Sequence, residues 1–148
     1  MRPTRSRPGG IRHLPEPGGT ATVAGMAGPL ALLAAAVVAL WGLAHAIPTR
    51  QVVAGFGPIG PDNRRVILQE WLAEAFAMWG LAAVITAATL AGGGTDAAVW
   101  TYRAVACLLV ALALLTAVTG ARTPVIWFKV CPVLLSGSAV LLLVASVV

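Results

Sequence analysis

The stretch that decides the fold is "PDNRRVILQEWLAEAFAMWGLAAVITAATLA", residues 61–91. Its first turns carry two adjacent arginines, Arg64 and Arg65, followed by two glutamates one helical turn apart, Glu70 and Glu74. From Ala75 it continues without a charge to its end. A helix that crosses the hydrocarbon of a bilayer needs about 20 consecutive, mostly apolar residues. The apolar residues do not alternate with a period of two, as they would in a barrel strand. The stretch therefore predicts a membrane helix whose first turns carry charges.

Three further segments have the same character. With the first stretch, the predicted helices lie at about residues 29–47, 63–91, 97–119 and 124–148, and residues 48–62 are expected to form a loop. The whole chain of 148 residues is 59% hydrophobic and only 10% charged, whereas a soluble domain is about 25% charged. The sequence thus predicts an all-α, polytopic membrane protein with a four-helix transmembrane bundle over residues 26–148, located in the inner or plasma membrane of a cell.

The N-terminal segment differs from the rest of the chain. Residues 1–25 are rich in arginine, proline and glycine and contain almost nothing to bury, which predicts a disordered tail. Met26 directly precedes the first apolar run, so translation could start at either methionine. The "AHA" at residues 44–46 imitates a signal-peptidase site. Cleavage of the first helix is thus an alternative to the four-helix interpretation, although its apolar run is longer than in most signal peptides.

The basic residues lie mostly at the ends of apolar segments, as topology signals do. A nucleic-acid partner is not expected, because the basic tail lacks aromatic residues and a fold. Antiparallel helices would place five basic residues at one end of the bundle, which we call the polar end. They are Arg50, Arg64, Arg65, Arg122 and Lys129. The opposite end would hold Arg103 and the tail with Arg2, Arg5, Arg7 and Arg12. The two sets favour contrary orientations, so the orientation in the membrane stays open.

The same topology brings most ionisable side chains of the helical region to the polar end. Two carboxylates four residues apart, Glu70 and Glu74, share one helix face and repel each other unless a cation or a proton neutralises them. Lys129 lies at a depth comparable to that of Glu74, so a Glu74–Lys129 pair is expected if their helices are neighbours. Ionisable residues inside a membrane usually face the bundle interior or a wet cavity. The candidate ligand-binding residues are therefore Glu74, Glu70, Lys129 and His45.

Each of these residues also has a purely structural interpretation. Glu70 can lie at head-group level, and His45 can cap or flank a helix end. The aliphatic part of Lys129 can lie in the apolar region while its ammonium group reaches the interface. The candidate residues for contact with phosphate or lipid head groups are Arg64, Arg65 and Arg122.

Other patterns carry little chemistry. Cys107 and Cys131 lie inside apolar runs and are expected to be buried packing residues. No metal site or cofactor is predicted, because the chain has no CxxC, HExxH or other ligand spacing. Ser136, Gly137 and Ser138 are expected at a close helix contact. Trp41, Trp71, Trp100, Tyr102 and Trp127 are expected to form interfacial belts.

The stretch "GFGPIGPDNRRVILQEWLAEA" at residues 55–75 has the look of a family signature. In size and hydropathy, residues 27–148 resemble small, four-helix bacterial membrane proteins of the DoxX-like kind. This resemblance implies a helical bundle in the bacterial cell membrane and assigns no functional residue.

Three functions remain open from the sequence. The first is a non-enzymatic accessory or assembly component whose partners are the bilayer and a second copy or another membrane protein. The second is a small-molecule or proton-coupled carrier that uses Glu74, in which Glu74→Gln would abolish uptake. The third is a membrane enzyme acting on a lipid or quinone-like substrate, which is disfavoured because no catalytic spacing is present.

Overall fold

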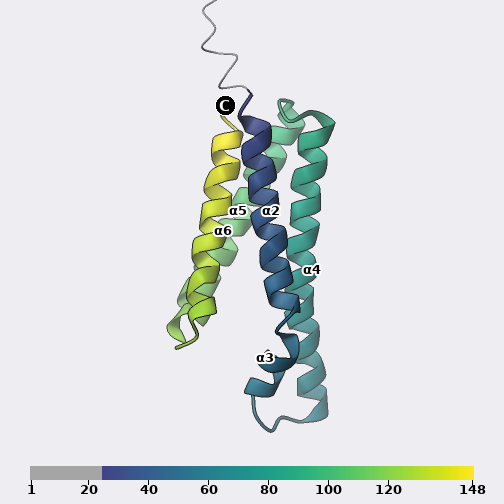
Figure 1. Cartoon of the computed structure of the whole chain (residues 1–148), viewed down its shortest axis with the longest axis vertical. Coiled ribbons are helices and arrows are strands. Elements are labelled where there is room, and N and C mark those ends of the chain that lie inside the picture. Colours follow the sequence, from purple (N-terminus) through teal and green to yellow (C-terminus); the bar gives the residue numbers. More distant parts are fainter. Residues whose placement is uncertain (1–24) are drawn as a thin grey trace, which may run out of the picture.

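The computed structural model describes residues 25–148, so the expected disordered tail lies almost entirely outside the described residues. Four long helices dominate: α2 (Ala27–Ala46), α4 (Pro61–Gly92), α5 (Asp96–Val118) and α6 (Ile126–Ala145). A short helix, α3 (Thr49–Gly55), follows α2, and a 3₁₀ turn, η1 (Gly120–Arg122), follows α5 (Figure 1). No strand occurs in residues 25–148. The all-α fold is confirmed.

The four long helices are long and apolar enough to cross a membrane, as expected for a multi-pass membrane protein. Large apolar side chains point outward from every one of them. The most exposed include Leu40, Phe76, Leu90, Leu114 and Val133, each with more than half of its surface accessible. Such a surface would be costly in water and suits a hydrocarbon solvent.

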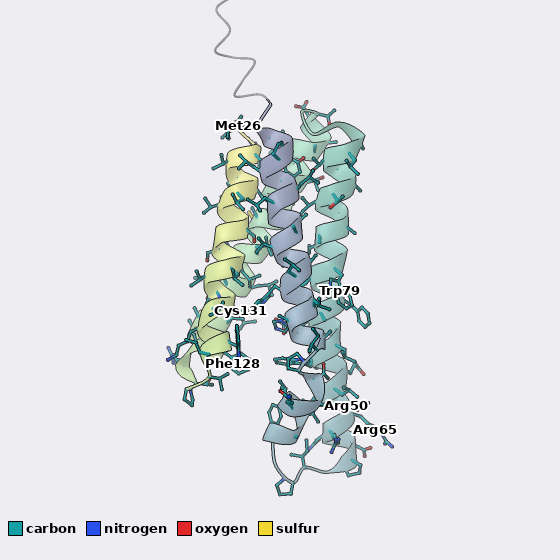
Figure 2. All side chains as sticks on the ribbon, viewed as in Figure 1. Met26, Arg50, Arg65, Trp79, Phe128 and Cys131 are labelled. Atoms are coloured by element: carbon teal, nitrogen blue, oxygen red, sulfur yellow. The ribbon has the colours of Figure 1, made fainter. Side chains whose placement is uncertain are left out.

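The bundle is antiparallel, and its neighbours are α2 with α4, α2 with α6, α5 with α6 and α4 with α5. Helices α4 and α6 therefore lie diagonally across the bundle. The 93–95 turn and the C-terminus lie at one end together with Met26, while α3 and η1 lie at the other (Figures 1 and 2). The predicted polar end is thus formed by the end of α2, α3, the start of α4, η1 and the start of α6.

Helix α4 extends farther than the others at the polar end (Figure 1). Its 32 residues span roughly 48 Å at ~1.5 Å per residue, against a hydrocarbon thickness of about 30 Å. The excess lies in its first turns, where Asp62, Arg64, Arg65 and Glu70 are all exposed. Length and charge together place these turns at head-group level.

Small residues allow close approach of α2 to its neighbours. Ala31, Ala34 and Ala35 are almost fully buried, and they pack with large side chains of the other helices. Gly42 is the tightest point, because a Cβ there would lie 2.8 Å from Nε1 of Trp79. Packing of this kind replaces the hydrophobic effect as the force that associates helices in a bilayer.

The helices differ from the expected ones most clearly at two places. Helix α3 was not predicted; the hydroxyl of Thr49 donates to the carbonyl oxygens of His45 (3.3 Å) and Ala46 (2.7 Å), so a helical course resumes beyond Pro48. Helix α6 begins at Ile126 rather than at residue 124. The hydroxyl of Thr123 bonds back to η1, at the carbonyl oxygen of Gly120 (2.7 Å), instead of capping α6.

Two packing expectations also need correction. Of the three small residues in α6, only Ser138 is buried, because Ser136 and Gly137 point away from the neighbouring helices. Of the expected belt residues, Trp100 and Trp127 are exposed, whereas Trp41 and Tyr102 are buried in the interior. Helices α2 and α5 turn these two aromatic faces inward, and at the polar end this produces the candidate site.

Candidate functional site

His45 lies in the last turn of α2 and is buried, with 7% of its surface exposed. Its Nδ1 lies 3.2 Å from the carbonyl oxygen of Trp41, one turn earlier in the same helix. Its own carbonyl oxygen accepts a hydrogen bond from the indole N–H of Trp71 at 2.7 Å. His45 thus lies at a helix end, as expected, and it is fixed from both its ring and its backbone.

The imidazole packs between aromatic rings of α2 and α4, and a ring of α6 packs against the second of these. It stacks on Trp71 of α4, with ring centres 5.0 Å apart, and meets Trp41 edge to face at 5.4 Å. Trp71 in turn meets Phe128 of α6 edge to face at 6.2 Å. This contact joins the diagonal helices α4 and α6 at the polar end, and Phe128 lies on the side of α6 that faces α2 (Figure 2). Edge-to-face and offset-stacked pairs are the favoured aromatic arrangements.

Glu74 supplies the charged partner of this histidine. Its Oε1 lies 3.5 Å from Nε2 of His45, and about a third of its side chain is exposed. The Trp41 carbonyl can only accept, so the hydrogen-bond pattern assigns a proton to Nδ1. Nε2 and a carboxylate oxygen are then two acceptors facing each other unless one further proton lies between them. A hydrogen bond between these two atoms therefore requires a proton on one of them.

The two buried indole N–H groups of the site are already used. Trp41 donates to Sγ of Cys131 in α6 at 3.2 Å, and Trp71 donates to the backbone of His45. These bonds tie α2 to α6 and α4 to α2, respectively. They hold the rings in place but leave no indole donor of this pair free for a ligand.

A partly open cavity of about 710 Å³ lies beside these rings at the polar end. Its walls come from the end of α2, from α3, from Trp71 of α4 and from the start of α6. The lining is aromatic and aliphatic apart from His45 and Gln51. Its aromatic members are Trp41, His45, Phe56, Trp71, Trp127 and Phe128. Its volume lies within the range of about 300–1,000 Å³ usual for small-molecule pockets.

The structure separates the residues that the sequence singled out. Glu74 and His45 come together, but Lys129 and Glu70 are exposed, and no Glu74–Lys129 ion pair forms among the described residues. That expected pair fails because α4 and α6 are diagonal, not neighbours. Arg64 and Arg122 are exposed, and Arg65 pairs with the exposed Asp62 at 2.9 Å. Within residues 25–148, no cluster of three or more His, Cys, Asp and Glu side chains could hold a metal ion.

Sequence reasoning missed the aromatic walls of the cavity. Trp41 and Trp71 were interpreted as belt residues, and Phe128 was not considered. One signal was available in the sequence, since Trp41 and His45 are four residues apart and must share a helix face. Cys131, expected to be a packing residue, is indeed buried and accepts the Trp41 hydrogen bond, whereas Cys107 is exposed on the outside of α5.

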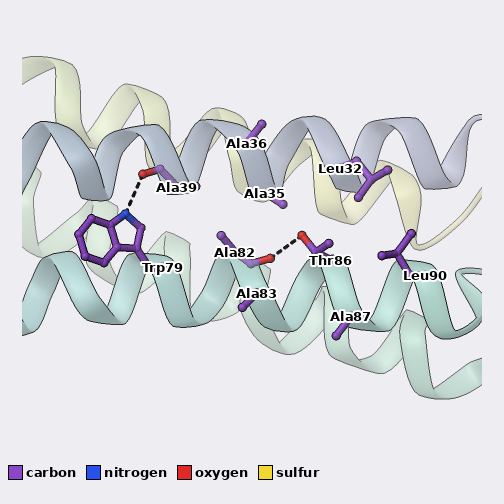
Figure 3. A pocket seen from close by; sticks show the side chains of 10 residues that line it. All are labelled: Leu32, Ala35, Ala36, Ala39, Trp79, Ala82, Ala83, Thr86, Ala87 and Leu90. Carbon is purple, nitrogen blue, oxygen red and sulfur yellow. Dashed lines mark hydrogen bonds between the residues drawn. The ribbon is translucent and has the colours of Figure 1, made fainter.

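A second hollow of about 660 Å³ runs between α2 and α4 on the outer surface of the bundle (Figure 3). It is lined mainly by alanine and leucine. Its polar groups are used within the protein: Trp79 donates to the carbonyl oxygen of Ala39 at 3.1 Å, and Thr86 donates to that of Ala82 at 2.8 Å. This groove offers apolar packing surface and no ligand chemistry.

The likeness to DoxX-like membrane proteins concerns size and hydropathy, and a four-helix arrangement supports many activities. What the site does has to be inferred from its own residues, because no family model, curated protein or solved structure matches this chain.

Proposed function

We propose that this chain is a non-enzymatic integral membrane protein that binds a lipophilic small molecule in the aromatic cavity at its polar end. The observation that carries the proposal is the cavity itself, with about 710 Å³ of space walled mainly by rings and aliphatic side chains. A concave, mostly apolar pocket with few polar groups is the usual form of a small-molecule site. Its position at the end of α2 would open it to molecules dissolved in one leaflet.

Several contacts support a binding site that is formed in advance. The rings of Trp41, His45, Trp71 and Phe128 hold one another through stacked and edge-to-face contacts. Hydrogen bonds from both buried indoles fix their orientation. A site that is rigid before binding loses less side-chain entropy when the ligand enters.

The test measures quenching of tryptophan fluorescence by a dibrominated 18-carbon alcohol, added to purified protein in detergent micelles. Ala44 is exposed and lines the cavity, so Ala44→Phe should fill part of it. Ala111 is an exposed alanine of α5 that lines neither hollow, so Ala111→Phe is the matched control. We expect saturable quenching of the wild type and of Ala111→Phe, and a loss of the saturable part in Ala44→Phe.

Trp100 provides an internal reference for this experiment. It is 66% exposed near the opposite end of the bundle, so it reports probe dissolved in the micelle. Equal, non-saturable quenching in all three proteins would show that the cavity binds nothing and would overturn the proposal.

The second candidate function, a proton-coupled carrier, is favoured by one observation. His45 lines the cavity and contacts Glu74 at 3.5 Å, and both side chains are of types that exchange protons. In proteoliposomes containing a pH-sensitive dye, the same alcohol probe should then drive proton movement in the wild type but not in Glu74→Gln. Proton movement that is absent from the wild type, or unchanged in Glu74→Gln, would remove this candidate.

A further inference from the structure

The chemistry of the cavity wall limits what part of a ligand can be buried there. A polar ligand atom needs a partner inside the cavity, because burying it without one is costly. The indole N–H groups of Trp41 and Trp71 already donate to Sγ of Cys131 and to the carbonyl oxygen of His45, respectively. The ring nitrogens of His45 face the Trp41 carbonyl and Glu74. The other polar side chain of the lining, Gln51, is exposed and can serve only a group near the opening. The buried part of a ligand should therefore be a hydrocarbon chain or an unsubstituted ring.

Basic residues lie close in the sequence to residues that line the cavity. Arg50 directly precedes the lining residue Gln51, Arg122 lies three residues before the lining residue Val125, and Lys129 follows the lining residue Phe128. These three basic side chains are exposed and come from α3, η1 and α6. A polar head placed at the mouth would thus meet positive charge from more than one element.

The acidic residues of this end do not cancel that charge. Asp62 is paired with Arg65, and Glu74 faces His45. Among the described residues of the polar end, five basic side chains stand against three acidic ones: Arg50, Arg64, Arg65, Arg122 and Lys129 against Asp62, Glu70 and Glu74. The excess is positive, so electrostatic complementarity favours an anionic head.

We infer that the ligand is an anionic amphiphile: its hydrocarbon chain enters the aromatic cavity, and its carboxylate or phosphate head lies at the rim near Arg50, Arg122 and Lys129. This inference rests on the proposed function and adds the chemical class of the ligand. The hydrocarbon chain of the ligand supplies affinity through the apolar area that it buries. The basic side chains near the opening select a ligand whose head is anionic. A cationic amphiphile would meet the aromatic faces, which attract cations, but its head would also meet the excess of arginine.

The test compares three probes that share one dibrominated 18-carbon chain and differ only in the head: a carboxylate, an alcohol and a trimethylammonium group. Saturable tryptophan quenching in uncharged detergent gives an apparent Kd for each. We expect the carboxylate to bind most tightly and the ammonium probe most weakly. A basic residue near a charged surface is worth about a fivefold change in affinity. The double variant Arg50→Gln/Arg122→Gln should therefore weaken carboxylate binding about 10-fold or more and leave the alcohol unchanged.

Arg64→Gln is the matched control, since Arg64 is an exposed arginine of the same end whose neighbours do not line the cavity. It should change none of the three affinities by more than about twofold. Saturable binding in which the alcohol or the ammonium probe equals or exceeds the carboxylate would overturn the inference and leave the proposed function intact. Binding of the carboxylate that does not respond to Arg50→Gln/Arg122→Gln would also overturn it.

Two more outcomes distinguish a failure of the proposed function from a failure of the inferred ligand class. If no probe binds saturably, or if Ala44→Phe alters none of the three affinities, the proposed function itself fails. If millimolar inorganic phosphate displaces the carboxylate probe, the site recognises a free anion. This result would overturn the inference that the ligand is an amphiphile.

Discussion

His45 and Glu74 meet at 3.5 Å between Nε2 and Oε1, and this contact links the end of α2 to α4 at the last charged residue of α4. Since Nδ1 of His45 faces a backbone carbonyl, the side chain at position 74 has to complement the lone pair or the proton on Nε2.

The first prediction concerns the chemistry at position 74. Glu74→Gln keeps a donor that can reach Nε2 and should change the free energy of unfolding by less than about 0.5 kcal/mol. Glu74→Leu leaves the buried nitrogen without a partner and should cost about 1–2 kcal/mol. Unfolding by a denaturing detergent, followed by tryptophan fluorescence, measures both.

Glu70 provides the control for this pair of variants. It is exposed one turn earlier on the same helix, so Glu70→Gln and Glu70→Leu should both be nearly neutral. A Glu74→Leu variant as stable as the wild type would mean that the contact contributes nothing to the bundle.

The second prediction concerns the closest approach of α2 and α4. In Gly42→Ala the new Cβ would lie 2.8 Å from Nε1 and 2.9 Å from Cδ1 of Trp79, and 3.0 Å from Cβ of Met78. Trp79 would have to move, which would disturb its hydrogen bond to Ala39 (Figure 3). Overpacking of this kind costs about 1–3 kcal/mol, which should appear in the same unfolding measurement and as a shift in the emission maximum.

Gly80 is the matched control, because a Cβ there would meet nothing within 4 Å. Gly80→Ala should stabilise α4 by up to about 1 kcal/mol through helix propensity. Equal effects of the two alanine variants would show that backbone entropy, not contact with Trp79, decides both.

The sequence predicted the number and class of the helices because hydropathy and segment length are local properties. The residue types before α5 offer two possible caps, Thr95 or Asp96, and the structure uses Thr95, whose Oγ1 accepts a hydrogen bond from the amide of Ala98 at 3.3 Å. The sequence did not predict α3, because Pro48 breaks the backbone ladder while Thr49 hydroxyl contacts with the end of α2 restore a helical course. Such side-chain contacts depend on a geometry that hydropathy does not record.

The candidate site was predicted only in part, and the reason is the packing order of the helices. Gathering His45 and Glu74 at one end follows from antiparallel topology alone. Choosing between His45 and Lys129 as the partner of Glu74 requires knowing that α2 adjoins α4 and that α6 lies diagonal to it. Nothing in one sequence specifies which of the possible arrangements of four helices is adopted.

The third prediction concerns Ser138 in α6, whose hydroxyl is buried and has no hydrogen-bond partner among the described residues. Several threonines of the bundle instead bond to a carbonyl one turn earlier, as Thr86 does. Ser138→Ala removes an unsatisfied polar atom and should raise the free energy of unfolding by about 1 kcal/mol. Ser136→Ala, at an exposed position of the same helix, should be neutral. Destabilisation by Ser138→Ala would instead indicate a buried water bound to the hydroxyl.

The fourth prediction concerns the end of the bundle opposite the candidate site. Tyr102 is fully buried, and its hydroxyl lies 2.8 Å from Oγ1 of Thr89. The Thr89 hydroxyl donates to the carbonyl oxygen of Ile85 at 2.7 Å, so Tyr102 is the donor to Thr89. Tyr102→Phe loses this one bond and should cost about 0.6–1 kcal/mol. Thr89→Val leaves the buried phenol without an acceptor and should cost about 1–2 kcal/mol.

A double-mutant cycle separates the contact between these two residues from their other effects. Because Thr89→Val damages the protein mainly by stranding the phenol, adding Tyr102→Phe should recover part of the loss. The double variant should thus cost clearly less than the two single variants together. Thr86→Val combined with Tyr102→Phe is the control, and it should be additive because Thr86 bonds only within its own helix. Strict additivity of Thr89→Val and Tyr102→Phe would mean that the bond between α4 and α5 does not form.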